Sequence, residues 1–128
     1  MGAPPSLAET MPFKAELKGA SEVPPTTSEG TGNLTATYDT TSKKLSWKGN
    51  VSGLSGNATA AHFHGPAEPG KNAPVMVPAP GTNTGAFEGT ATLTDEQAKA
   101  LTAGQTYFNV HTAANPNGEL RGQVEVAK

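Results

Sequence analysis

The stretch KLSWKGNVSGL, residues 44–54, decides the fold class of this chain. Its apolar residues Leu45, Trp47 and Val51 stand at positions that share one face of a strand, and polar residues occupy the other face. Such alternation is typical of an antiparallel strand with one buried face. Trp47, the only tryptophan of the chain, is therefore expected in the core.

The same alternation recurs on both sides of this stretch. Further strands are predicted in FKAELKG (13–19), GNLTATYD (32–39), NATAAHFHG (57–65), APVMVPAP (73–80), GAFEGTATL (85–93), QTYFNVHT (105–112) and ELRGQVEVA (119–127). Segments rich in Gly, Pro, Asn or Ser separate them and are typical of turns. We therefore expect an all-β fold, an antiparallel Greek-key β-sandwich or barrel of about eight strands.

One segment favours a helix instead. In TDEQAKALTAG, residues 94–104, Thr94 is a suitable N-cap and Gln97 completes a capping box. Gly104 is a suitable residue to end the helix. The expected fold thus contains one short helix.

Composition restricts the class of protein. The chain has 128 residues, no Cys and a formal net charge of -2. One domain is expected, and disulfides and thiolate metal sites are excluded. Without a basic patch or a long apolar run, we expect no nucleic-acid partner and no membrane insertion. Residues 1–11 are expected to be a flexible leader, left by signal processing or by cloning, before a β domain over residues 12–128.

The motif AAHFHG, residues 60–65, contains two of the three histidines. In a strand, His62 and His64 project from one face, with Cα atoms roughly 6.5 Å apart. Ala61 and Phe63 take the inner face, so both histidines point away from the core. Two imidazoles on one outward face are seldom needed for packing, and they can converge on one metal ion.

The third histidine follows the same rule. In QTYFNVHT, Phe108 and Val110 form the apolar face, and His111 lies on the opposite face with Asn109. If this strand lies near the HxH strand, three imidazoles meet. Three neutral imidazoles suit Cu(II), Zn(II) or Ni(II), and the Irving–Williams order favours copper, with zinc as the alternative. Three protein ligands leave a position open for water, substrate or a fourth ligand.

Four further residues are candidates around this site. Met76 can point with the histidines and supply a thioether, which suits Cu(I), although filling a gap in the core is the favoured alternative. Pairing across AANPNG would bring Glu119 opposite His111 and Arg121 opposite Asn109. Glu119 or Asn109 would then orient an imidazole, and Arg121 would attract an anion. An ordinary cross-strand pair is the favoured alternative for Glu119 and Arg121.

No catalytic residue is predicted. The chain has no nucleophile elbow, phosphate loop or dinucleotide fingerprint, and no carboxylate pair stands out. The alternative to a metal site is that the histidines hydrogen-bond loop carbonyls and hold GPAEPGKNAP and AANPNG in place.

Several of these segments resemble the CHRD domain, which is named from chordin. They are FKAELKGASEVPP, KLSWKGNVSGLSG, AAHFHGPAEPGKNAPVMV, TDEQAKALTAG and YFNVHTAANPNGELRGQV, and they extend from about Phe13 to about Val126. The resemblance implies a secreted or periplasmic β-sandwich or barrel. In chordin the domain is a repeated module of an extracellular protein that binds a growth factor, whereas in bacteria it often stands alone.

Carried onto this chain, the family's histidine positions are His62, His64 and His111. Its remaining marks are Asn109, Asn115, Gly118, Glu119, Arg121 and Gly122. Met76 stands where aliphatic residues are usual, a departure that is either incidental or the mark of a copper-specialised member. A looser analogy is with Cu/Zn superoxide dismutases, which also place an HxH pair on a Greek-key barrel, but three histidines cannot build both a copper and a zinc site.

Three hypotheses for the function follow. The first is a periplasmic or secreted metal-binding protein, with copper as Cu(I) or Cu(II), that handles copper or exchanges electrons. The second is a copper-dependent superoxide dismutase-like enzyme in which Arg121 steers the anion. The third is a metal-free extracellular module that binds a protein partner. The chain is expected to be a monomer or a metal-bridged homodimer.

Overall fold

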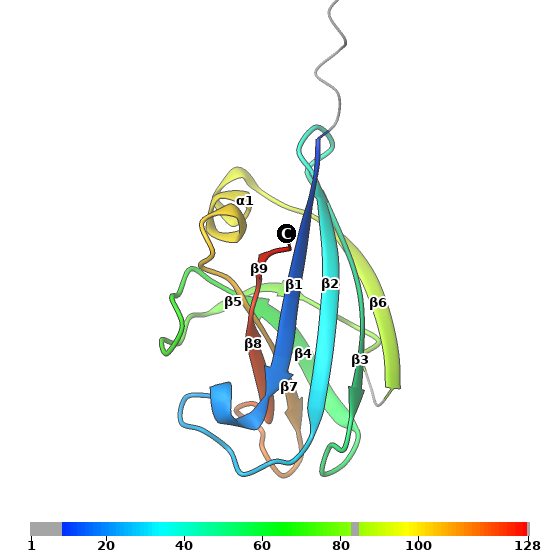
Figure 1. The fold of residues 1–128 in the computed structure, drawn as a ribbon, viewed down its shortest axis with the longest axis vertical. Helices are drawn as coiled ribbons and strands as arrows, with labels where there is room; N and C mark the ends of the chain where they lie inside the picture. The colour runs from blue at the N-terminus through cyan, green and yellow to red at the C-terminus, as the bar shows by residue number, and fades with distance from the viewer. Residues whose placement is uncertain (1–8, 83–84, 128) are drawn as a thin grey trace, which may run out of the picture.

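The computed structural model describes residues 9–82 and 85–127 (Figure 1). Helix α1 (Asp95–Thr102) lies between β6 and β7, and the 3-10 helix η1 (Gly19–Ser21) follows β1. Within the described residues the strands are β1 (Thr10–Lys18), β2 (Thr31–Asp39), β3 (Lys44–Ser52), β4 (Ala58–His64), β5 (Val75–Pro78), β6 (Gly85–Thr92), β7 (Tyr107–Thr112), β8 (Leu120–Gln123) and β9 (Glu125–Val126).

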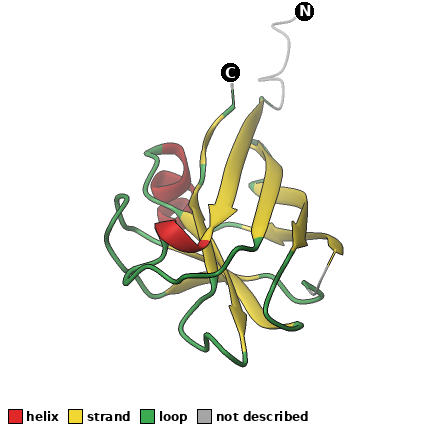
Figure 2. Cartoon of the chain, turned by 60° about the horizontal axis from the view of Figure 1, so that its bottom comes forward, coloured by secondary structure: helices red, strands yellow, loops and turns green. Residues whose placement is uncertain are grey.

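The strands form an antiparallel sheet that is nearly closed into a barrel (Figures 1 and 2). Their order is β5-β4-β7-β8-β1-β2-β3-β6, and β9 pairs with β1. β1, β2 and β3 are neighbours in sequence and in the sheet, but the chain then crosses from β3 to β4 and from β5 to β6. The expected all-β class with one short helix is confirmed.

The core explains how the two ends of this sheet are held together. The alternating apolar residues of 44–54 are buried, as the sequence predicts. Trp47 of β3 packs edge-on against Phe63 of β4, with 5.0 Å between ring centroids. Phe87 of β6 stacks on Phe108 of β7 at 5.7 Å. Because neither pair joins neighbouring strands, these contacts cross the interior of the barrel.

Helix α1 has the predicted capping box. Gln97 N donates to Thr94 Oγ1 at 3.1 Å, and Thr94 N donates to Gln97 Oε1 at 2.9 Å. Leu101 is fully buried in the core, and Gly104 follows the helix with a φ of 77°, a conformation that suits glycine. Gln97 Nε2 also donates to Met76 O at 2.9 Å, so α1 is attached to the edge strand β5.

The two ends of the domain differ from the sequence expectation. β1 begins at Thr10, inside the expected leader, because Met11 pairs with Tyr38 of β2. Residues 1–8 of that leader lie outside the described residues. The last predicted strand is divided at Val124, whose N–H donates to Thr106 O at 2.8 Å. The division allows β8 to pair with β7 and β9 to pair with β1.

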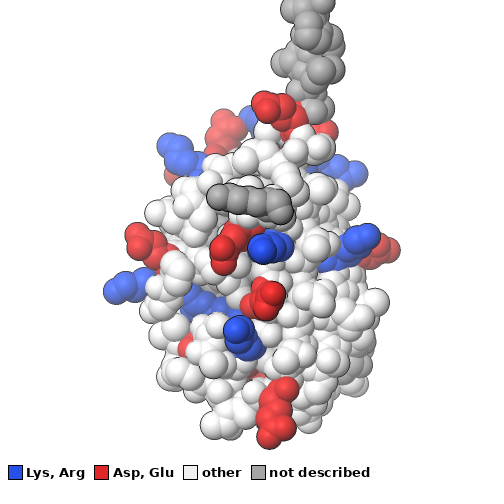
Figure 3. Space-filling model, viewed as in Figure 1, with Lys and Arg blue, Asp and Glu red and all other residues white. Residues whose placement is uncertain are grey.

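Charged side chains are interspersed on the surface. On the face drawn in Figure 3, acidic and basic groups alternate without a patch of one sign. This matches the low formal net charge of the sequence. None of the helices in residues 9–82 and 85–127 is long and apolar enough to cross a membrane.

Candidate metal centre

The three histidines meet on the outer face of β4 and β7. The strands pair so that His62 lies opposite Asn109, and His111 lies opposite Ala60. One ring nitrogen from each histidine lies within 4.8 Å of the other two. The ring centroids are 5.0 Å apart for His62 and His111, 5.4 Å for His62 and His64, and 6.2 Å for His64 and His111. The convergence that strand alternation predicts is therefore present.

Hydrogen bonds determine which nitrogen of His111 carries the lone pair. Nδ1 of His111 lies 2.9 Å from the carbonyl oxygen of Pro116. A carbonyl only accepts, so Nδ1 carries the hydrogen and Nε2 of the neutral ring carries a lone pair. This Nε2 lies 3.2 Å from Nδ1 of His62, which therefore donates to it.

The same reasoning applies to His64, which is the most buried of the three. Its Nδ1 donates to the carbonyl oxygen of Ala73 at 2.9 Å, so its Nε2 carries a lone pair. His64 is 8% exposed, and this Nε2 has no hydrogen-bond partner among the described residues. A buried acceptor without a donor costs free energy, and a bound cation would satisfy it. The ring nitrogens of the three histidines therefore fit the ligand set of a metal ion.

The environment also sets the charge of these rings. Burial lowers the pKa of His62, and the neighbouring rings of His111 and His64 lower it further. Burial likewise lowers the pKa of His64. Both rings are consequently neutral at pH 7, which is the form that binds a metal ion.

A stack of side chains supports His64. The ring of Tyr107 is parallel to the ring of His64, with 4.8 Å between centroids and 1° between planes. Arg121 Cζ lies 3.5 Å from the centroid of Tyr107. The Tyr107 hydroxyl donates to Ala73 O at 3.2 Å and accepts from Ala73 N at 3.0 Å. Tyr107 thus contacts both the His64 ring and the carbonyl that fixes its tautomer.

Arg121 does not have the exposed position that the sequence suggests. It pairs with Asn109 as expected, but it is only 2% exposed. Its guanidinium donates to Asn72 Oδ1 at 2.9 Å and to Lys71 O. The loop after β4 therefore covers it, and Arg121 anchors this loop. This burial does not support the expectation that Arg121 attracts a free anion, which remains a prediction. Strand alternation alone does not tell which loops lie over an outer face.

Glu119 was expected to orient an imidazole, but the hydrogen bonds among the described residues give its carboxylate other partners. It is fully buried, and its carboxylate accepts hydrogen bonds from Ser28, Ser55, Thr112 and Asn115. Burial alone would raise its pKa, but these hydrogen bonds lower the pKa to about 2. His111 is oriented instead by the carbonyl of Pro116. Glu119 therefore connects the segments that precede β2 and β4 to the turn between β7 and β8.

Met76 lies at an irregularity in the pairing of β4 with β5. The register shifts between Phe63 and His64, so that Val77 pairs with Phe63 and Val75 with His64. Val77 is 4% exposed and Val75 is 52% exposed, although alternation places both on one face. Met76 is half-buried and packs against the hydrophobic core. The irregularity removes the alternation on which the thioether prediction depends, and it favours the gap-filling alternative.

Asn109 lies at the centre of this face. It pairs with His62 of β4 and with Arg121 of β8, and it is 3% exposed. Its Oδ1 has no hydrogen-bond partner among the described residues. Of the three residues predicted to surround the histidines, Asn109 is the one whose surroundings match that position.

Glu22 lies beside Asn109 and Arg121, and the sequence analysis missed it. It is 5% exposed, and its Oε2 has no hydrogen-bond partner in the described part of the chain. Burial raises its pKa to about 7, although Arg121 and Asn109 act in the opposite direction. A Cβ on Gly118 would clash with Glu22 Oε2 and lie 2.8 Å from Asn109 Nδ2, so glycine is required there. An acidic residue in a Pro- and Ser-rich connection gives no sequence signal of such burial.

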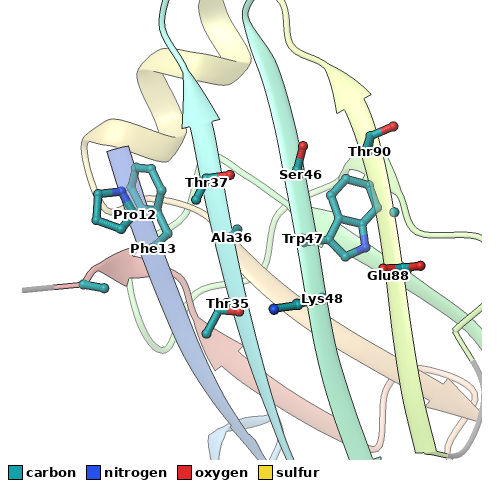
Figure 4. Close-up of a pocket in the computed structure, with 12 residues that line it drawn as sticks. Pro12, Phe13, Thr35, Ala36, Thr37, Ser46, Trp47, Lys48, Glu88 and Thr90 are labelled. Carbon is teal, nitrogen blue, oxygen red and sulfur yellow. The ribbon is translucent and has the colours of Figure 1, made fainter. Parts of the chain in front are cut away.

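A groove of about 780 Å³ lies elsewhere, on the sheet of β1, β2, β3 and β6 (Figure 4). Its lining includes Thr35, Thr37, Ser46, Lys48 and Glu88. The charged pair in this lining consists of direct cross-strand neighbours, an arrangement common on exposed sheets. The groove holds no histidine, so the histidine face is the stronger candidate site.

Fold and site together define a barrel-like β domain with a three-histidine group that is able to hold a metal ion. A family model for the CHRD domain matches residues 13–124, and the chain belongs to this family. CHRD domains are generally extracellular modules. A search of curated proteins found no match to the chain.

Proposed function

We propose that the protein is a secreted or periplasmic copper-binding protein, whose ion is held by His62, His64 and His111. The observation that supports this most is the buried lone pair on His64 Nε2, in a group whose ligand atoms lie within 4.8 Å of one another. The group offers imidazoles only, and such a set favours copper over other divalent ions, with zinc as the alternative. Copper handling or electron exchange is the corresponding role.

The hydrogen bonds assign the ligand nitrogen of each ring. His64 and His111 would bind through Nε2, because Nδ1 of each donates to a carbonyl. His62 would bind through Nδ1, the nitrogen that faces His111, once the hydrogen on it has moved to Nε2. The two carbonyls would hold the rings in place, as partners in the second coordination sphere commonly do.

The test is a metal titration of the apo-protein with Cu(II), Zn(II) and, under reducing conditions, Cu(I). We expect one ion per chain, and a loss of affinity of about 100-fold or more in each of His62→Ala, His64→Ala and His111→Ala. Glu88→Ala, an exposed carboxylate on the other part of the sheet, is the matched control. Affinity unchanged by all three histidine substitutions would reject this ligand set.

The dismutase alternative depends on Arg121 as an anion guide, and the burial of that residue removes this support. We expect copper-loaded protein to remove superoxide no faster than free aqueous copper does. A faster rate, lost in His64→Ala, would restore the enzyme hypothesis.

A further inference from the structure

Glu22, Asn109 and His64 form a row of buried polar side chains behind the histidine cluster. Their exposures are 5%, 3% and 8%. The Asn109 side chain lies beside Glu22 at Gly118, and it influences the pKa of both Glu22 and His64. Each residue nevertheless has one buried atom without a hydrogen-bond partner among the described residues: Glu22 Oε2, Asn109 Oδ1 and His64 Nε2. All three atoms are acceptors when Glu22 is ionised.

These three side chains have fewer hydrogen-bond donors than their buried acceptors require. Only the Nδ2 group of Asn109 has hydrogens to offer within it. Arg121, the charged group that faces Glu22, gives its hydrogen bonds to Asn72 and Lys71. The Nδ1 hydrogen of His64 goes to Ala73. Because buried acceptors without donors are costly, the row requires one more proton or a cation.

A rotation of the Asn109 amide connects two arrangements that satisfy this requirement. In the first, protonated Glu22 donates to Asn109 Oδ1, and Asn109 Nδ2 donates to His64 Nε2. In the second, Asn109 Nδ2 faces ionised Glu22, and His64 Nε2 is free for a cation. The structure is closer to the second, since Asn109 Nδ2 and Glu22 Oε2 both lie beside Gly118.

We propose that Glu22 is a positioning residue of the metal site, which acts through Asn109 and loses its proton when an ion binds His64. This inference rests on the proposed metal-binding function. The exchange balances without a redox step: the ion takes the lone pair of His64 Nε2, and the proton of the Glu22 carboxyl goes to the buffer. The groups that face Glu22 are Arg121 of β8 and Asn109 of β7, together with the backbone of Val23. A pKa of about 7 places the exchange near neutral pH.

The test counts the protons released per bound ion. Calorimetric titration with Zn(II), which is not redox-active, in two non-coordinating buffers of different ionisation enthalpy gives this number. At pH 7 we expect wild-type protein to release about 0.5 proton more than Glu22→Gln, and at pH 9 the difference should vanish because Glu22 is already ionised. Glu16→Gln, an exposed carboxylate of β1, should release as many protons as wild type.

Affinity gives a second measurement. The side-chain amide introduced by Glu22→Gln imitates the protonated acid and keeps Asn109 turned toward His64. We therefore expect Glu22→Gln to bind Zn(II) about 10-fold more weakly than wild type above pH 8, and almost equally at pH 5.5. A purely structural role would weaken binding by the same factor at both pH values.

Three outcomes decide the inference. Equal proton release from wild type and Glu22→Gln, with ion binding intact in both, would overturn it. If Glu22→Gln fails to fold, infrared difference spectra of wild type decide instead: Zn(II) should remove a protonated-carboxyl band, and a band that persists would overturn the proposal. Absence of stoichiometric binding in wild type by equilibrium dialysis would reject the proposed function itself, and the inference with it.

Discussion

At the scale of single residues, Tyr107 links a candidate ligand to the loop that covers it. Removing its hydroxyl in Tyr107→Phe keeps the ring against His64 but takes away the acceptor of Ala73 N. We expect about 1 kcal/mol lower stability and about 10-fold weaker Cu(II) binding. Denaturant unfolding and metal titration measure the two effects. Tyr38→Phe, at the other tyrosine, is the control, and equal Cu(II) affinities in the two variants would contradict the role.

Glu119 gives the prediction for acid stability. The pKa of Glu119 in the folded state is about 2, below the ordinary 4.5. The ionised carboxylate therefore stabilises the folded state above pH 4.5, and this stabilisation is lost as the pH falls toward 2. Glu119→Gln should lower the free energy of unfolding by about 2–4 kcal/mol at pH 7, with a gap to wild type that narrows below pH 4.5. Urea unfolding at pH 7, 4 and 3 checks this. A difference in free energy of unfolding between Glu119→Gln and wild type that stays constant with pH would contradict this prediction. The control Glu16→Gln, at an exposed carboxylate, should unfold with the same free energy as wild type.

At the scale of elements, strand alternation predicted the histidine cluster because alternation is a local property of the backbone. His62 and His64 share a face in any strand, and His111 joins them once β7 pairs with β4. Burial by loops is not local. The segments after β1 and β4 cover Arg121 and enclose Glu22, and the strand pattern contains no information about their paths.

The short strand β5 shows a second limit of local reasoning. Its irregularity arises in the pairing with β4, and therefore cannot be predicted from VMVP alone. Met76→Leu conserves volume, so we expect its stability to change by less than about 1.5 kcal/mol. Its affinities for Cu(I) and Cu(II) should both equal those of wild type. A selective loss of Cu(I) in the titration would restore the thioether as a ligand.

At the scale of the whole molecule, the cluster connects parts of the barrel that are distant in sequence. It joins β4 to β7, and its carbonyl partners come from the loops that follow each strand. An ion that binds only the folded state should stabilise it by about 2.7 kcal/mol when its free concentration is 100 times its Kd. Thermal unfolding with and without Cu(II) measures this as a rise in Tm. The rise should vanish in His111→Ala; an equal rise there would indicate binding outside the cluster.

The three rings are unequally buried, so the cluster has an exposed side and a covered side. His62 and His111 are half-buried, whereas His64 lies beneath the loop after β4. An incoming ion therefore meets the outer pair before it reaches the inner nitrogen, and a competing chelator attacks from that same direction. In the proposed metal site, an ion would therefore enter and leave on the same side, over His62 and His111.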